Sequence, residues 1–186
     1  MTISRTVTFE YTASPSEVAG LLQDPVFLRY RSEQAGERNI DVKVEPAAGG
    51  VRITVSREKT VDVPAFARIA VGNVSRAVES SFWRQDGQKW HAEYTIEVSG
   101  LPVKVQGKSM LSPTAKGCHY TSTFETNARI PLIGGRIASL FADGLVEQLL
   151  ANAERNAAAL VRDSERGPRS FIDGLREHGA QTANEG

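Results

Sequence analysis

Hydrophobic and polar residues alternate along most of the first two thirds of the chain. From Ile3 to Tyr11, the bulky residues Ile3, Val7, Phe9 and Tyr11 are separated by serine, threonine and glutamate. This period of two is typical of a strand with one buried face. The same alternation, interrupted by turns such as AAGG, DGQ and SPTAKG, predicts an antiparallel meander of further strands at 40–45, 51–63, 74–85, 89–99, 103–111 and 118–126.

Two short helices are predicted directly after the first strand. Ser14 can cap the first helix, Pro15 suits its first position, and Glu17 completes a capping box three residues after the cap. Asp24 followed by a proline repeats the signal, and Gly36 ends the second helix. The period changes again after the last strand, where apolar residues recur at helical spacing and predict one long helix from Gly135 to about Val161.

These elements define one domain with an α+β fold. A curved antiparallel sheet of about seven strands wraps around the long C-terminal helix, the one element long and apolar enough to cover the concave face. We expect the domain to span residues 1–163, with 164–186 as a mobile or loosely docked tail. The irregular segment 64–73 is predicted to be a loop.

A single helix cannot fill a strongly curved sheet, so the fold predicts an apolar pocket closed at one end by the two short helices. Alternation along the strands and the spacing on the helices select the residues expected to line it. These are Phe27, Tyr30, Val55, Arg57, Val78, Phe82, Trp90, Tyr94, Ile96, Val105, Tyr120, Phe124, Ile137, Phe141 and Leu145.

The composition argues against several classes of function. The 22 basic residues equal the 22 acidic ones and do not cluster, which argues against nucleic-acid binding. One cysteine allows no internal disulfide, and three histidines at unrelated spacings indicate no metal site. The N-terminus lacks a signal-peptide pattern, and no segment has the roughly 20 apolar residues of a membrane span. We expect a cytoplasmic protein without cofactor or metal; the oligomeric state stays open.

The segment RIPLIGGRIASLF joins the last strand to the long helix and contains two adjacent glycines, Gly134 and Gly135. It matches neither the P-loop pattern nor the dinucleotide-binding pattern. A hinge is the better interpretation, because Pro131 disfavours helix at the residue before it and glycines permit a sharp turn. A β-branched residue at either glycine is therefore expected to destabilise the fold.

Few polar residues suggest chemistry. Arg57, Arg76 and Arg84 each continue an alternation of apolar residues, so one of them could meet a carboxylate or phosphate group in the pocket, although ends of strands also carry such arginines. Other polar candidates have plainer interpretations: His91 and His119 as outward histidines, Asp143 and Glu147 as a solvated helix face, and Cys118 as a buried thiol.

The order of elements, with RIPLIGGRIASLF before the terminal helix, resembles the helix-grip fold of the START-like (SRPBCC) superfamily, which includes polyketide cyclases and plant pathogenesis-related proteins. The stretches YTASPSEVAGLLQDPVFLRYR and ARIPLIGGRIASLF resemble a bacterial family of uncharacterised proteins within it. The resemblance covers about residues 2–161. It implies a cavity for lipids, polyketides or other hydrophobic small molecules, and it brings no catalytic motif.

Three functions remain open from the sequence. The first is a non-enzymatic protein that binds or transports a hydrophobic small molecule. The second is an enzyme of the polyketide cyclase or aromatase type, in which Arg57, Tyr94 or Tyr120 polarises the substrate. The third is an interaction module that docks partners through the tail around Phe171 and Leu175.

Overall fold

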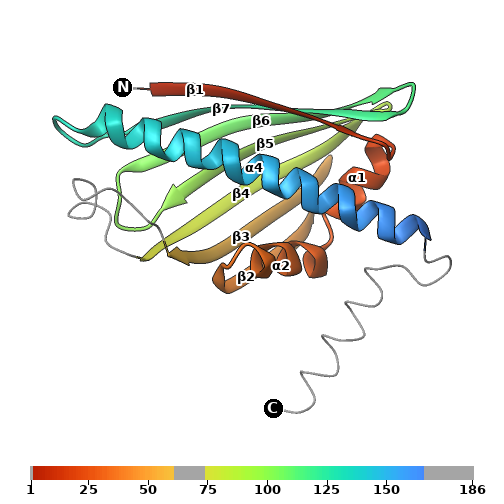
Figure 1. Cartoon of the computed structure of the whole chain (residues 1–186), viewed down its shortest axis with the longest axis horizontal. Coiled ribbons are helices and arrows are strands. Elements are labelled where there is room, and N and C mark those ends of the chain that lie inside the picture. Colours follow the sequence, from red (N-terminus) through yellow and green to blue (C-terminus); the bar gives the residue numbers. More distant parts are fainter. Residues whose placement is uncertain (1, 61–73, 166–186) are drawn as a thin grey trace, which may run out of the picture.

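The computed structural model describes residues 2–60 and 74–165 (Figure 1). The predicted loop at 64–73 and the docking segment around Phe171 lie outside the described residues, as does the predicted tail beyond residue 165. The described elements, in chain order, are β1 Thr2–Tyr11, α1 Pro15–Leu22, α2 Pro25–Gln34, β2 Arg38–Ala47, β3 Gly50–Thr60, β4 Val74–Asp86, β5 Lys89–Val98, β6 Val103–Thr114, β7 Gly117–Ala128 and α4 Gly134–Glu165.

The seven strands form one antiparallel sheet in the order β1-β7-β6-β5-β4-β3-β2. Strands β2 to β7 are consecutive hairpin neighbours, as the alternation predicts. Strand β1 pairs instead with the last strand, in a register that places Thr2 opposite Asn127 and Tyr11 opposite Cys118. The two short helices therefore carry the chain from one edge of the sheet to the other, around the end of the sheet (Figure 1). The predicted helix-grip fold is confirmed.

Local signals fix both short helices at the predicted residues. The Ser14 hydroxyl accepts a hydrogen bond from the Glu17 amide at 3.3 Å, and the Glu17 carboxylate accepts one from the Ser14 amide at 2.8 Å. Asp24 caps α2 by accepting from the amides of Val26 and Phe27 at 2.9 and 3.0 Å. Because these bonds satisfy amides that the helices leave free, the ends of α1 and α2 are set by their own sequences.

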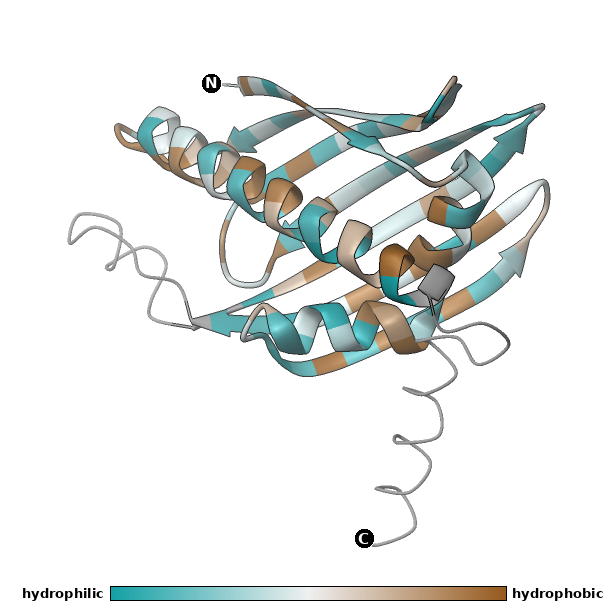
Figure 2. Ribbon diagram, turned by 45° about the vertical axis from the view of Figure 1, so that its right-hand side comes forward, coloured by the Kyte–Doolittle hydropathy of each residue, from teal (hydrophilic) through white to brown (hydrophobic). Residues whose placement is uncertain are grey.

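The long helix α4 lies across the concave face of the sheet, from one side of the molecule to the other (Figure 1). It packs more extensively on β1 and β7 than on any other strand, and Arg5 on β1 reaches Asp143 on α4 at 2.8 Å. Its hydrophobic and hydrophilic positions are interleaved (Figure 2). The helix therefore leans toward the β1 edge and leaves the concave face of β3 to β5 less covered. No described helix combines the length and hydropathy that a membrane span needs.

The segment between β7 and α4 turns sharply. Leu132 has a positive φ of 67° and is fully exposed, and the Gly134 amide donates to the Ile130 carbonyl at 2.8 Å. A Cβ atom on Gly134 would lie 2.6 Å from the Ala128 carbonyl oxygen. Glycine at this position therefore lets the start of α4 approach the end of β7 more closely than any side chain would permit.

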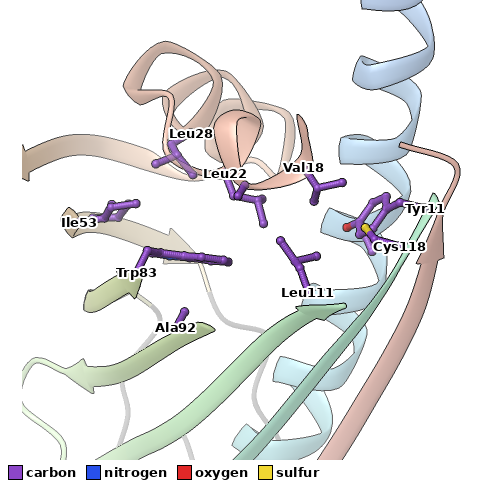
Figure 3. Close-up of a cluster of buried hydrophobic side chains, with 12 residues drawn as sticks. Tyr11, Val18, Leu22, Leu28, Ile53, Trp83, Ala92, Leu111 and Cys118 are labelled. Atoms are coloured by element: carbon purple, nitrogen blue, oxygen red, sulfur yellow. The ribbon is translucent and has the colours of Figure 1, made fainter. Parts of the chain in front are cut away.

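The hydrophobic core is divided along α4. One cluster surrounds Ile137 and Ala138 at the start of the helix, and a second surrounds Phe124 and Ala142 near its middle. The largest cluster lies between α1, α2 and the sheet, where Leu22, Leu28, Ile53, Trp83 and Leu111 point toward one another (Figure 3). A cavity lies between the second cluster and this largest one.

Candidate functional site

A partly open cavity of about 90 Å³ lies between the sheet and the middle of α4. Apolar side chains from β3, β5, α1, α2 and α4 form much of its wall. Polar side chains complete it, and they are more numerous than an apolar pocket would require. The polar residues at the wall are Tyr11, Arg31, Arg57, Glu79, Ser81, Tyr94, Ser109, Tyr120, Gln148, Asn152 and Asn156.

A second pocket of about 180 Å³ adjoins the cavity, between α4 and strands β3 to β6. The two share Arg57, Ile96, Leu145 and Gln148 as lining residues, so they meet at this point. The second pocket is mainly apolar, with Phe141 among its lining residues. Because its lining also includes the exposed Lys59, it connects the junction to the surface.

Arg57 is held at the junction by two carboxylates. Its guanidinium lies 3.2 Å from Glu37 and 2.7 Å from Glu79, and Gln148 on α4 donates to Glu37 at 3.2 Å. Burial alone would lower the pKa of Arg57, but the two carboxylates reverse this and raise it. Burial likewise would raise the pKa of Glu79, yet the two arginines at the cavity, Arg57 first and then Arg31, hold it below the ordinary value.

A chain of four hydroxyl groups crosses the floor of the cavity. Ser109 donates to Ser122 at 3.0 Å, and Tyr94 and Ser122 are bonded at 2.9 Å. Tyr120 and Ser109 are bonded at 3.1 Å. Because Ser109 uses its hydrogen on Ser122, Tyr120 must donate to Ser109. One hydroxyl hydrogen is then left over at the other end of the chain, at Tyr94 or at the fully buried Ser122.

The position of the Tyr94 ring depends on a glycine. Gly107 lies opposite Tyr94 on the neighbouring strand β6. A Cβ atom built on Gly107 would fall inside van der Waals contact with the ring and hydroxyl of Tyr94. The absent side chain lets the phenol cross β6 and reach Ser122 on β7, so the hydroxyl chain requires this glycine.

Asn156 organises the far end of the cavity. Its side-chain oxygen accepts from Arg31 at 3.5 Å, and its side-chain nitrogen donates to the Tyr11 hydroxyl at 3.1 Å. Burial raises the pKa of Tyr11, Tyr94 and Tyr120 above the usual range for a phenol, so all three stay protonated at neutral pH. They can donate or accept hydrogen bonds but do not serve as bases.

Most of the predicted lining residues come together. The first cavity is lined by Val55, Arg57, Tyr94, Ile96, Tyr120 and Leu145, and the adjoining pocket by Val105 and Phe141. Phe27 and Tyr30 lie instead in a separate cluster between α2 and α4. Phe124 and Ile137 belong to the packed core near α4, and the indole of Trp90 contacts Ser16 on α1.

The prediction for β4 was wrong by one residue. Val78 and Phe82 lie on the face of the sheet turned away from α4, next to outward residues such as Glu97 and Glu93. The inward positions of β4 are Ala77, Glu79, Ser81 and Trp83, as their pairing with inward β5 residues shows. The alternation misleads here because two inward positions are polar and the outward face carries apolar residues. Arg76 and Arg84 share that outward face.

Sequence reasoning missed the amides and Arg31. Gln148, Asn152 and Asn156 recur every four residues and so lie on one face of α4, which the structure turns toward the cavity. That spacing was a usable signal. Arg31 follows Phe27 by four residues on α2 and shares its side of the helix. Cys118 is buried, as predicted, and burial raises its pKa to about 11.

No group of three histidine, cysteine, aspartate or glutamate side chains in residues 2–60 and 74–165 could hold a metal ion. Some polar wall groups bond to one another, whereas others, such as the Arg31 guanidinium and the Tyr11 hydroxyl, keep unused donors. What the arrangement can do chemically is bind a molecule that is apolar over much of its surface and that carries groups able to accept hydrogen bonds.

Solved structures share the fold at low sequence identity. The protein TTHA0849 from Thermus thermophilus is 17% identical with a TM-score of 0.58, covering 86% of this chain and 99% of that one. A START superfamily protein from Mycobacterium smegmatis is 12% identical with a TM-score of 0.55, covering 86% and 98%. The di-domain ARO/CYC BexL from the BE-7585A biosynthetic pathway is 14% identical with a TM-score of 0.59, covering 84% and 49%.

These likenesses confirm the predicted START-like fold. No curated protein matches the chain by sequence. One family model does match, over residues 6–160, which is most of the chain and nearly all of the described domain. The chain therefore belongs to the family described as "Protein of unknown function (DUF2505)".

Proposed function

We propose that the protein binds a small hydrophobic molecule carrying polar groups, in the cavity between the sheet and α4. The observation that supports this most is the wall of the cavity, where apolar side chains and hydrogen-bonding groups face one space. Ligand sites typically combine a mostly apolar wall with a few placed polar groups. A purely structural core would have little use for so many buried polar side chains, because each one must be bonded.

The cavity volumes limit the size of the ligand. The cavity of about 90 Å³ and the pocket of about 180 Å³ are together smaller than the roughly 300 Å³ of a site for drug-sized molecules. We therefore expect a slender or small ligand that enters through the second pocket, passes the junction at Arg57 and reaches the hydroxyl chain. A bulkier ligand requires that α2 or α4 move outward.

Native mass spectrometry of the purified protein, followed by organic extraction, tests this proposal. We expect a bound small molecule, or uptake of a fluorescent fatty acid that competitors displace. Leu145→Trp fills the junction of the two pockets and should abolish uptake. The matched control is Leu150→Trp, at an exposed position on the same helix, which should bind normally. A wild-type protein that takes up nothing would overturn the proposal.

The hydroxyl chain favours a second candidate, a cyclase or aromatase type of enzyme. The uncommitted hydroxyl hydrogen at the Tyr94 end could polarise a substrate carbonyl and stabilise the enolate formed from it. The similarity in fold to a protein described as an ARO/CYC makes this activity the one to test first. Incubation with a poly-β-keto thioester should give a cyclised product, and Tyr94→Phe should lower its rate. Equal product with and without protein would exclude the activity.

A further inference from the structure

The two arginines at the cavity differ in their partners. Arg57 is bonded by two carboxylates, at 3.2 and 2.7 Å. Arg31 has one hydrogen bond, a long one of 3.5 Å to the side-chain oxygen of Asn156, and no carboxylate of the described residues lies within 4 Å of it. A guanidinium has five N–H donors and stays charged at any pH at which the protein is folded. Most of the donors of Arg31 are therefore uncommitted at the cavity wall.

Tyr11 adds a second donor beside Arg31. Because arginine has no acceptor, the oxygen of the Asn156 amide must face Arg31, and the amide nitrogen must then donate to the Tyr11 oxygen. The Tyr11 hydrogen has no acceptor in the described part of the chain. Arg31 and Tyr11 thus form a corner with several free donors, and each of its two acceptors, the Asn156 and Tyr11 oxygens, already accepts one hydrogen bond. Such a corner fits a ligand group that only accepts hydrogen bonds.

Among the described residues, the charge of Arg31 is balanced only at a distance and has no direct ion-pair partner. Arg57 with Glu37 and Glu79 carries a net charge of minus one, which Arg31 balances from a distance through its attraction to Glu79. Burial lowers the pKa of Arg31, because a half-buried guanidinium is less well solvated than one in water. An isolated buried charge is costly unless it is paired. A carboxylate matches the planar fork of a guanidinium with two oxygens, whereas a doubly charged phosphate would meet more repulsion from Glu79.

We infer that the cavity takes a monocarboxylic acid, whose carboxylate pairs with Arg31 and Tyr11 and whose apolar part extends past Arg57 into the second pocket. This rests on the proposed function, since it names the class of ligand for the same site. The sequence suggested such a role for an arginine at Arg57, but that side chain is already neutralised. Arg31, on the helix that closes the end of the sheet, takes the role instead.

Isothermal titration with decanoate and with decan-1-ol at neutral pH tests the inference, because the two probes share a chain and differ in the charged group. We expect wild type to bind decanoate at least about tenfold more tightly than the alcohol, as befits a charge-assisted pair. Arg31→Met should remove that preference. Arg31→Lys should restore part of it, and Tyr11→Phe should cost about fivefold in decanoate affinity.

The control variant is Arg29→Met, which removes an exposed arginine from the same helix and should leave both affinities unchanged. If wild type binds both probes equally, the carboxylate inference is overturned while the proposed function stands. If wild type binds neither, both are overturned. The comparison of the two probes on wild type needs no variant. The inference can therefore be overturned even if Arg31→Met does not fold.

Discussion

The two halves of α4 face the same sheet with different chemistry. In the N-terminal half, Ile137, Ala138 and Ala142 are completely buried and pack against Val103 and Ala128, among others. From Gln148 onward, the residues that face the sheet include three amides, Gln148, Asn152 and Asn156, which line the cavity. The first part of the helix meets the sheet mainly through apolar side chains, whereas the later part places polar groups among its apolar ones.

Stability and ligand binding depend on different parts of the helix. In the apolar half, Ile137, Ala138 and Ala142 are close-packed, and their side chains need no hydrogen-bond partners. At the cavity, the amides of α4 and the charged groups of other elements cost free energy unless each is bonded. We therefore expect mutations in the apolar half to change stability alone, and mutations at the cavity to change pH dependence and binding as well.

The largest effect is expected for Arg57→Met. The change leaves Glu37 and Glu79 without their cation, and breaking a buried ion pair costs about 4 kcal/mol. In wild type the pKa of Glu79 is lowered from 4.5, so its ionised carboxylate contributes to the free energy of unfolding above that pH. This contribution is lost as the pH falls through the pKa that Glu79 has in the folded protein. Without Arg57, burial raises that pKa instead. Urea unfolding should show that Arg57→Met loses more of the wild-type free energy of unfolding at pH 7 than at pH 4.

Ile137→Ala should lower the free energy of unfolding by about 3 kcal/mol, because it leaves a cavity in the packed half of the interior. No titratable group is involved, so urea unfolding should give the same loss at pH 7 and at pH 4. Affinity for the fatty-acid probe should not change. A pH-dependent loss here would break the distinction between the two halves.

Gly134→Ala should cost about 2 kcal/mol in thermal or urea unfolding, because the new Cβ would press on the Ala128 carbonyl at the hinge. Valine should cost more. The matched control is Gly144→Ala on the same helix, where the added Cβ would meet no atom within 4 Å and alanine should stabilise the helix by about 1 kcal/mol. An unchanged melting temperature for Gly134→Ala would contradict the hinge interpretation.

Tyr94→Phe should have the smallest effect on stability, about 1 kcal/mol, since Ser122 keeps its bond from Ser109. The same variant should change ligand binding, because it removes a hydroxyl that lines the cavity. Equilibrium unfolding and probe titration on one sample separate the two effects. A stability loss as large as that of Ile137→Ala would mean that the hydroxyl chain belongs to the core.

The sequence was sufficient for the fold because its signals are local: the cap at Ser14, the alternation on β5 and the helical spacing after Gly135 each determine one element. It was less sufficient for the site. Whether a strand turns its odd or even positions inward depends on pairing, and on β4 the polar inward residues Glu79 and Ser81 hid the correct choice. The meeting of Arg31 with Asn156 spans 125 positions of sequence and follows only from packing.

The pairing of β1 with β7 also determines when the cavity can exist during folding. Strands β2 to β7 join in consecutive hairpins, whose contacts are close in sequence and form early. The pairing of Thr2 with Asn127 instead joins residues far apart in the sequence, so we expect it to form late. Because α4 rests chiefly on β1 and β7, it can dock only after that closure. We therefore expect the chain to pass through a sheet without its helix wall, and the capacity to bind a ligand to be the last property that the protein acquires.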